Sequence, residues 1–139
     1  MVLAGKRVVL IDDSIVRGTT SLKIVRMVRE AGAREVHLRS ASPPIKFPDF
    51  YGIDMPDRDR LLAATKSHEE MRQLLEVDSL GFLSVDGLYW AMDAGPRDPA
   101  NPQFTDHYFT GDYPTRLADR EFAEGRNEWA DRQLSLLEA

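Results

Sequence analysis

Near its start the chain has an apolar run, an amphipathic stretch and a second apolar run. Residues 7–11 end in four consecutive apolar side chains, which is typical of a strand buried on both faces of a parallel sheet. Apolar residues then recur at positions i, i+3, i+4 and i+7 of residues 24–31, on one face of a helix that Thr20 or Ser21 would cap. Residues 36–41 predict a second strand. Together these elements predict a βαβ unit with parallel strands.

The rest of the chain predicts shorter elements separated by irregular segments. Four prolines favour a long loop over residues 42–57, and Ser67 with Glu70 has the spacing of a helix capping box. In chain order, we expect helices at 57–64 and 67–76, a strand end at 82–85, a helix after Gly87, an irregular stretch at 95–115 and a helix at 118–137. The chain is thus divided into an α/β segment, residues 1–115, and a C-terminal helical segment, residues 116–139.

Composition and charge restrict the possible functions. Apolar residues make up 42% of the 139 residues, enough for the core of one domain. A net charge of −5 argues against general nucleic-acid binding, although backbone N–H groups can still hold a local anion. The absence of cysteine excludes disulfides and thiolate catalysis in this chain. No apolar run approaches the ~20 residues of a membrane helix, and Met1 to Arg7 lack a signal-peptide segment, so we expect a soluble, cytoplasmic protein without membrane partners.

The candidate chemistry is concentrated in residues 8–21, where the first strand meets the helix. The strand delivers Asp12 and Asp13 at its carboxyl end, where open α/β sheets bind ligands. Carboxylates accept hydrogen bonds from vicinal sugar hydroxyls and attract Mg²⁺, a hard cation. Gly18 permits a turn with inward N–H groups, and the helix N-terminus behind it can hold a phosphate. The pattern predicts a ribose 5-phosphate site.

The predicted substrate-binding residues span the whole loop. They are Asp12, Asp13, Ser14, Ile15, Val16, Arg17, Gly18, Thr19, Thr20 and Ser21. Asp12 and Asp13 are also the predicted Mg²⁺ contacts. A simpler interpretation makes the two acids plain strand-end residues and the hydroxyls helix caps, but a cap and a phosphate ligand use the same unpaired N–H groups and are compatible.

The loop resembles the fourteen-residue fingerprint of type I phosphoribosyltransferases: four apolar residues, two acids, then a turn rich in Gly and Thr. Residues 13–20 are similar to the version of this loop in glutamine phosphoribosylpyrophosphate amidotransferases. Further segments resemble that family in the same order along the chain: residues 41–44, 51–56, 80–88 and 109–115. The resemblance therefore covers residues 5–115.

The resemblance implies a fold and an activity. The fold is α/β, a type I phosphoribosyltransferase-like (Rossmann-like) parallel sheet, of which residues 1–115 are the C-terminal part, incomplete at its N-terminal side. The parent enzyme transfers ammonia from glutamine to phosphoribosyl diphosphate, giving 5-phosphoribosylamine in the first step of purine biosynthesis. Mg²⁺ would be the cofactor, and purine nucleotides would compete for the site as inhibitors.

The sequence departs from the family's pattern in ways that predict an inactive fragment. Without cysteine there is no glutaminase nucleophile, and the segments that close over the substrate lie upstream in the family. Some members bind an iron–sulfur cluster through a C-x-x-C, but Thr105 and Tyr108 occupy these places, so we expect no cluster. No residue is assigned a catalytic role here. A sheet edge exposed by the missing strands predicts self-association into homo-oligomers.

Two other functions share features with parts of this sequence. Residues 9–14 also resemble the first strand of a receiver domain, whose acidic pair holds Mg²⁺ near a phosphorylated aspartate. Asp54 before Met55 and Pro56 imitates that aspartate, but a receiver has two residues between the aspartate and Met-Pro, and the Gly18 turn has no role there. The other alternative is a non-catalytic nucleotide-binding module that uses the same loop.

Overall fold

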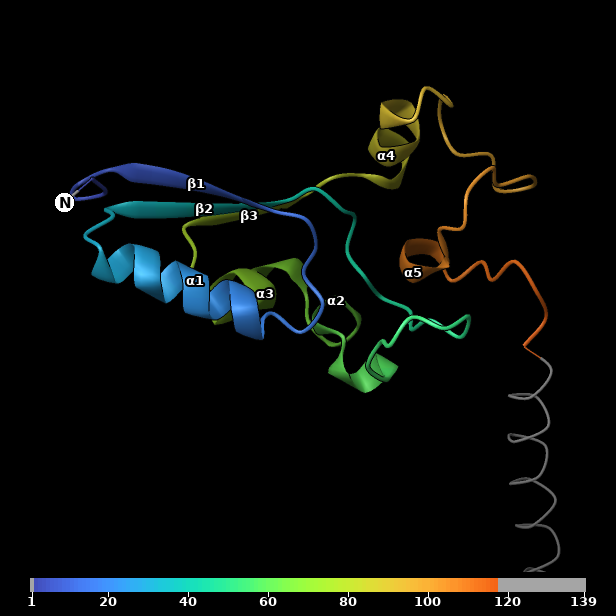
Figure 1. Ribbon diagram of the computed structural model, residues 1–139, viewed down its shortest axis with the longest axis horizontal. Helices are drawn as coiled ribbons and strands as arrows, with labels where there is room; N and C mark the ends of the chain where they lie inside the picture. Colours follow the sequence, from blue (N-terminus) through green and yellow to red (C-terminus); the bar gives the residue numbers. More distant parts are fainter. Residues whose placement is uncertain (1, 118–139) are drawn as a thin grey trace, which may run out of the picture.

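The computed structural model describes residues 2–117, and its centre is a sheet of three parallel strands (Figure 1). In spatial order these are β1 (Arg7–Asp12), β2 (Glu35–Ser40) and β3 (Ser79–Phe82). Val8 is paired with Val36, and Leu38 is paired with Leu80. The predicted α/β class and the parallel βαβ unit are therefore confirmed.

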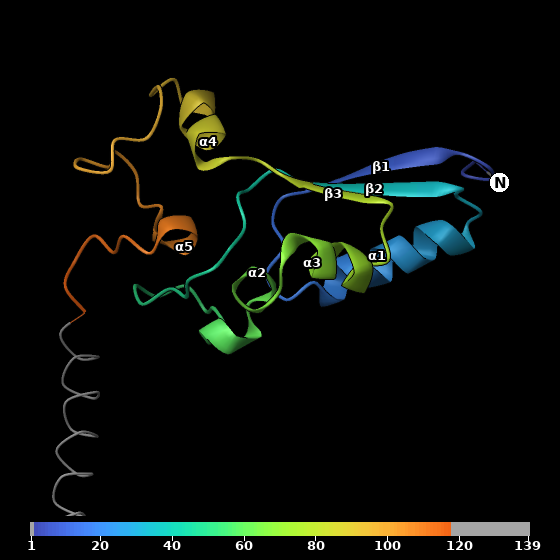
Figure 2. The same ribbon diagram turned by 180° about the vertical axis from the view of Figure 1, so that it is seen from behind.

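The helices are short apart from the first. They are α1 (Thr19–Glu30), the 3₁₀ turn η1 (Arg58–Arg60), α2 (Leu62–Thr65), α3 (His68–Leu74), α4 (Val85–Ala91) and α5 (His107–Thr110). The helices α1, α2 and α3 lie on one side of the sheet, and α4 and α5 lie beyond the carboxyl ends of the strands (Figure 1, Figure 2). No helix within residues 2–117 is long and apolar enough to cross a membrane.

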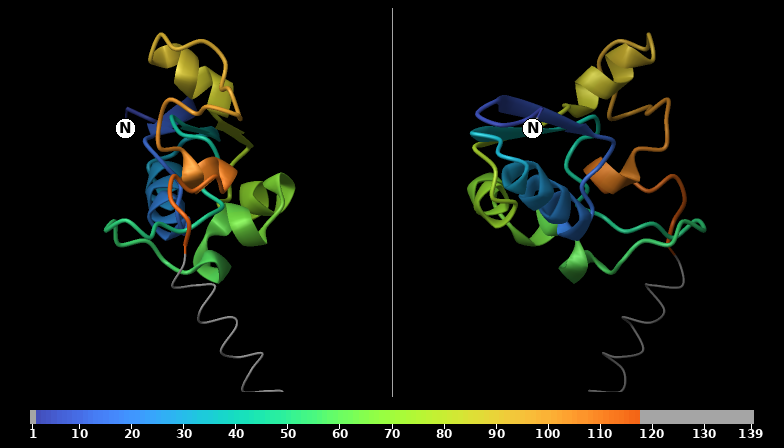
Figure 3. Two further views of the ribbon diagram at one scale, coloured as in Figure 1. Left: turned by 90° about the vertical axis from the view of Figure 1, so that its right-hand side faces the viewer. Right: turned by 60° about the vertical axis from the view of Figure 1, so that its left-hand side comes forward.

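The core lies between the sheet and the helices beneath it. Val25 of α1, Val36 and Leu38 of β2, and Leu75 at the end of α3 are almost fully buried. Burying side chains of this size contributes about 1.5–3 kcal/mol each. Seen end-on, α1 and α3 lie side by side under the sheet (Figure 3). This packing fixes the end of β1 relative to the first turn of α1.

The opposite face of β1 is open. Val9 is 60% exposed and Ile11 is 79% exposed, whereas their neighbours Val8 and Leu10 are partly buried. Within the described part of the chain, the prediction that residues 7–11 are buried on both faces is therefore wrong. The reason is that the helices of this segment cover one face of the sheet, and β1 is an edge strand.

Several local predictions differ from the structure by a few residues. The capping box of Ser67 and Glu70 is confirmed at the start of α3, and residues 42–57 form no helix or strand. The first helix begins at Thr19, with Gly18 rather than Thr20 or Ser21 at its N-cap. Three other regions also differ: β3 ends at Phe82 instead of spanning 82–85, Ser84 caps α4, and α5 interrupts the stretch 95–115. The helix expected at 118–137 lies outside the described residues.

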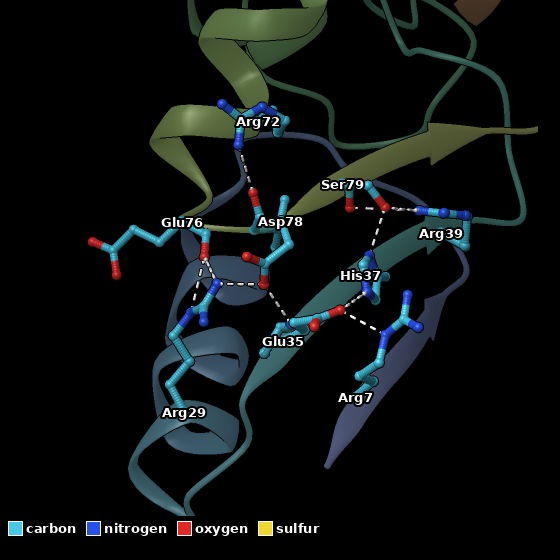
Figure 4. A network of polar contacts seen from close by, with 11 residues as sticks. Arg7, Arg29, Glu35, His37, Arg39, Arg72, Glu76, Asp78 and Ser79 are labelled. Atoms are coloured by element: carbon cyan, nitrogen blue, oxygen red, sulfur yellow. Dashed lines mark hydrogen bonds and ion pairs between the residues drawn. The ribbon is translucent and has the colours of Figure 1, made fainter. Parts of the chain in front are cut away.

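A network of polar contacts joins the amino-terminal ends of the strands to α1 (Figure 4). Asp78 accepts hydrogen bonds from the backbone N–H of Val36 at 2.6 Å and from Arg29 at 2.9 Å. Arg29 also donates to the backbone carbonyl of Glu76, which has a left-handed φ of 56°. The hydrogen bond from Val36, followed by that from Arg29, lowers the pKa of Asp78. These contacts hold the turn that leads into β3.

The elements beyond the sheet are organised around a buried ion pair. Arg97 contacts Asp106 at 2.5 Å, and their side chains are 10% and 3% exposed. Tyr89 of α4 also donates to Asp106, at 2.8 Å. Burial raises the pKa of Asp106, but the hydrogen bonds from Arg97, Tyr89 and Thr110 outweigh this effect and lower it. The carboxylate of Asp106 thus links α4, the following loop and α5.

Candidate functional site

The two acids of the loop lie where β1 ends. Asp12 is the last residue of β1 and is paired with Ser40 of β2, while Asp13 follows it as an exposed residue. Ser21 donates its hydroxyl to Asp12 Oδ2 at 3.3 Å. Asp13 Oδ1 accepts the backbone N–H of Ser14 at 2.6 Å. Asp12 Oδ1 also accepts the backbone N–H of Asp13 at 3.1 Å, so both oxygens of Asp12 are held locally, whereas Asp13 is held through Oδ1. Asp13 Oδ2 and the remaining lone pairs of Asp12 can accept from a ligand.

The turn after the acids is fixed by backbone geometry. Gly18 adopts φ 77° and ψ −6° as the N-cap of α1, and its carbonyl accepts the N–H of Leu22 at 2.9 Å. The carbonyl of Val16 accepts the N–H of Leu62, at 2.9 Å, so the loop also rests on α2. The first-turn N–H groups of α1 have no partners inside the helix and carry the positive end of its dipole. These are the features of a phosphate site.

The loop forms one side of an open depression of about 460 Å³. It is lined by Asp12, Asp13, Ser14, Val16, Arg17, Gly18, Thr19, Thr20, Ser21, Asp54, Met55 and Pro56. Nine of the ten predicted site residues therefore line one depression. The tenth, Ile15, is 2% exposed and packs in the core, where it anchors the loop instead of facing the depression.

Residues 54–56 line the depression but were outside the predicted site. They lie in the irregular segment between β2 and η1, more than thirty positions after the loop. No local pattern brings such a segment to the same depression as the loop, although its resemblance to the amidotransferase family was a usable signal. Asp54 is on this irregular segment and not at a strand end, unlike the phosphoacceptor of a receiver domain.

The donor set suits a hydrated Mg²⁺ better than a metal held in a protein cage. No group of three or more His, Cys, Asp or Glu side chains is close enough to hold a metal ion in the part of the chain that the structure describes. Mg²⁺ usually keeps several waters and takes one or two carboxylates together with substrate phosphate oxygens. Asp12 and Asp13 fit that role beside a phosphate site.

Curated relatives match most of the chain. An amidophosphoribosyltransferase of Rhizobium etli is 68% identical over 119 residues, which are 85% of this chain and 24% of the relative. The Bacillus subtilis amidophosphoribosyltransferase is 52% identical over 84% of this chain and 24% of its own length. A chloroplastic amidophosphoribosyltransferase of Arabidopsis thaliana is 46% identical over 96% of this chain and 23% of its own. The chain therefore spans about a quarter of the length of these relatives.

Solved structures agree with this result. A glutamine phosphoribosylpyrophosphate amidotransferase from B. subtilis, complexed with ADP and GMP, matches with a TM-score of 0.75 and 52% identity over 84% of this chain and 25% of that one. An allosteric regulatory enzyme of purine biosynthesis matches with a TM-score of 0.70 and 47% identity over the same shares. No protein-family model matches the chain. By sequence and by fold, the chain belongs to the amidophosphoribosyltransferases, as a segment of about a quarter of their length.

Proposed function

We propose that residues 12–21 bind the ribose 5-phosphate part of phosphoribosyl diphosphate in an enzyme that makes 5-phosphoribosylamine. One observation carries the proposal: a single depression combines two strand-end carboxylates with the N-terminus of α1 and a left-handed Gly18. A carboxylate pair suits a sugar diol, and a helix N-terminus suits a phosphate monoester. A ribose 5-phosphate carries a diol and a phosphate monoester in one molecule.

Each part of the loop has a separate role in this proposal. The N–H groups of Thr19, Thr20 and Ser21 and the hydroxyls of Thr19 and Thr20 hold the 5-phosphate, while Asp12 and Asp13 orient the ribose through its hydroxyls. The Ser21 hydroxyl is used on Asp12. Mg²⁺, when bound with the diphosphate, would be held beside the same two carboxylates and would neutralise the charge of the leaving group. Holding the sugar and its phosphate in one orientation is the main contribution of these residues to the reaction.

The complete reaction needs groups from outside this chain. The chain spans about a quarter of the length of its relatives and contains no cysteine that could serve as a glutaminase nucleophile. We therefore propose that the chain binds the ribose-phosphate ligand by itself but does not transfer ammonia. The B. subtilis relative is complexed with ADP and GMP, and both nucleotides contain a ribose 5-phosphate. Purine nucleotides should accordingly compete for the depression.

Calorimetric titration of the chain tests the binding proposal. Mg²⁺–phosphoribosyl diphosphate and GMP are titrated separately into wild-type protein and into an Asp12→Asn/Asp13→Asn variant. Wild-type protein should bind both ligands, and the variant should lose at least tenfold in affinity because the diol loses charge-assisted hydrogen bonds. Asp57→Asn, on an exposed residue outside the depression, is the matched control and should bind like wild type.

The outcomes separate the alternatives. Equal binding by wild-type protein and the Asp12→Asn/Asp13→Asn variant would refute the assigned role of the acids. If the wild-type protein binds GMP but does not bind phosphoribosyl diphosphate, the result would favour a nucleotide-binding module. Circular dichroism of each sample is needed to establish that a protein without binding is still folded.

A further inference from the structure

Asp49 is a buried carboxylate outside the residues that line the depression. Its side chain is fully buried, and its two oxygens accept four hydrogen bonds. Oδ2 accepts the backbone N–H groups of Tyr51 and Ile53, both at 2.8 Å. Oδ1 accepts His107 Nε2 at 2.9 Å and the Tyr108 hydroxyl at 3.1 Å. One oxygen therefore folds the local turn, and the other fastens that turn to α5.

The carboxylate is ionised in this environment. Burial by itself raises the pKa of Asp49, but the hydrogen bonds from Ile53, Tyr51, Tyr108 and His107 outweigh burial and lower the pKa to about 2. Because an ionised carboxylate only accepts hydrogen bonds, His107 must carry its hydrogen on Nε2. The tautomer of His107 is thus set by Asp49.

His107 contributes more than a packed ring. It is completely buried. The centroid of its ring lies 4.0 Å from that of Tyr108 and 4.9 Å from that of Tyr113. Among residues 2–117, its Nδ1 is the only buried side-chain nitrogen or oxygen without a hydrogen-bond partner. A buried nitrogen without a partner costs free energy that a phenylalanine ring at this position would avoid. The compensating contact of the imidazole is the Nε2 hydrogen bond to Asp49.

The turn held by Asp49 leads directly into the wall of the depression. The last N–H group that Asp49 accepts is that of Ile53, and the next three residues, Asp54, Met55 and Pro56, line the depression and are called its wall here. The backbone immediately before the wall is therefore fixed by Asp49, which is itself fixed by α5. The loop of residues 12–21, which lines the same depression, has its own supports in β1, α1 and α2.

We infer that Asp49 and His107 are positioning residues that hold residues 54–56 against the ligand, an inference that rests on the proposed ribose-phosphate site. The phosphate is held by the N-terminus of α1, which the pair does not touch. The sugar and the groups attached to it extend from that phosphate into the rest of the depression, whose lining includes residues 54–56. Loosening the pair should therefore weaken the binding of ribose 5-phosphate and leave the binding of inorganic phosphate almost unchanged.

Two substitutions of His107 distinguish positioning from packing. His107→Gln keeps a side-chain N–H that can reach Asp49, whereas His107→Phe keeps the ring and loses the N–H. If the hydrogen bond holds the wall, His107→Gln should resemble wild type. His107→Phe should show about tenfold faster amide hydrogen exchange at Tyr51 and Ile53. If the residue only fills space, the order of the two variants is reversed, and this result would overturn the inference.

Hydrogen exchange by NMR on the full chain without ligand is the first readout. The amides of Val36 and Leu38, in the central strand, should keep wild-type protection and show that each variant is folded. Asp49→Asn repeats the test from the carboxylate side, because an amide cannot accept all four donors, and Asp57→Asn is its matched control. Unchanged exchange at Tyr51 and Ile53 in Asp49→Asn would also overturn the inference.

Ligand affinity is the second readout. Ribose 5-phosphate and inorganic phosphate are titrated separately into wild-type, His107→Gln and His107→Phe protein. The Kd for ribose 5-phosphate should rise about tenfold in His107→Phe, with less than a twofold change for phosphate. Equal losses for both ligands would contradict a role confined to the wall. If wild-type protein does not bind ribose 5-phosphate, the proposed function fails, while hydrogen exchange still decides whether the pair holds the wall.

Discussion

A β-carbon at position 18 would lie 2.8 Å from Cδ2 of Leu62, because Gly18 is pressed against the start of α2. The same β-carbon would lie 3.1 Å from a methyl carbon of Leu75. The phosphate turn is therefore supported by two side chains that follow it by more than forty positions. Its shape depends on the packing of α2 and α3 as well as on its own sequence.

Gly18→Ala should destabilise the protein more than Gly95→Ala. Both glycines have a left-handed φ, at 77° and 71°, so each alanine costs about 1 kcal/mol in backbone strain. A β-carbon on Gly95 meets nothing within 4 Å, whereas one on Gly18 must displace Leu62 and Leu75. Urea unfolding of the two variants measures the difference. Equal losses of stability would mean that the contact with Leu62 does not affect the free energy of unfolding.

Ser21→Ala should lower the free energy of unfolding by about 1 kcal/mol. Ser21 is 4% exposed, and its hydroxyl donates to Asp12 at the end of β1. Thr20→Ala, at the exposed neighbouring position, is the matched control and should change stability much less. Thermal unfolding followed by circular dichroism compares the two variants. Similar melting temperatures would argue that the Ser21–Asp12 hydrogen bond contributes nothing to stability.

Arg97→Ala should destabilise the region of α4 and α5 by about 2–3 kcal/mol, because it leaves Asp106 buried without its cation. Tyr89 and Thr110 would still donate to that carboxylate, which limits the loss. Arg26→Ala is the control, since the pair of Arg26 and Glu76 is about half exposed and should matter little. Chemical denaturation checks this ranking, and a larger loss in Arg26→Ala would contradict it.

Stability should fall in acid and depend partly on Asp49. Its pKa is lowered from an ordinary value of 3.8 to about 2, so its contribution is complete above pH 3.8 and is lost as the pH falls toward 2. Urea midpoints measured from pH 7 to pH 2 should stay level at first and then decline. Asp49→Asn should be less stable at pH 7 and decline less steeply below pH 4. Parallel curves for the two proteins would rule out this role of Asp49.

The open face of β1 should promote self-association. Val9 and Ile11 are both largely exposed on an edge strand, where apolar side chains and unpaired backbone groups favour contacts between chains. Ile11→Lys should shift the protein toward monomer in sedimentation velocity at micromolar concentration. Met92→Lys, at a 60% exposed position on the C-cap of α4, is the control and should leave the distribution unchanged. A monodisperse wild-type monomer would contradict the prediction.

Local sequence was sufficient for the elements whose signals are local. The apolar run of residues 7–11, the helical spacing of 24–31 and the Ser67 capping box each specify a strand, a helix or a cap from neighbouring residues. The helix start was missed because the N-cap is Gly18, which makes no side-chain cap hydrogen bond, and Ser21 lies inside the first turn with its hydroxyl on Asp12. β3 was displaced because a short apolar stretch does not mark its own boundaries.

By itself the sequence determined the family and the order of acids, glycine and hydroxyls in the loop, because those features lie within fourteen consecutive residues. Only the tertiary structure decided that residues 54–56 line the same depression as the loop and that Ile15 packs in the core. It also decided the pairing of Asp49 with His107, 58 positions apart. Such relationships depend on how distant segments pack, and packing is set by the burial of apolar side chains across the whole fold, which no local pattern records.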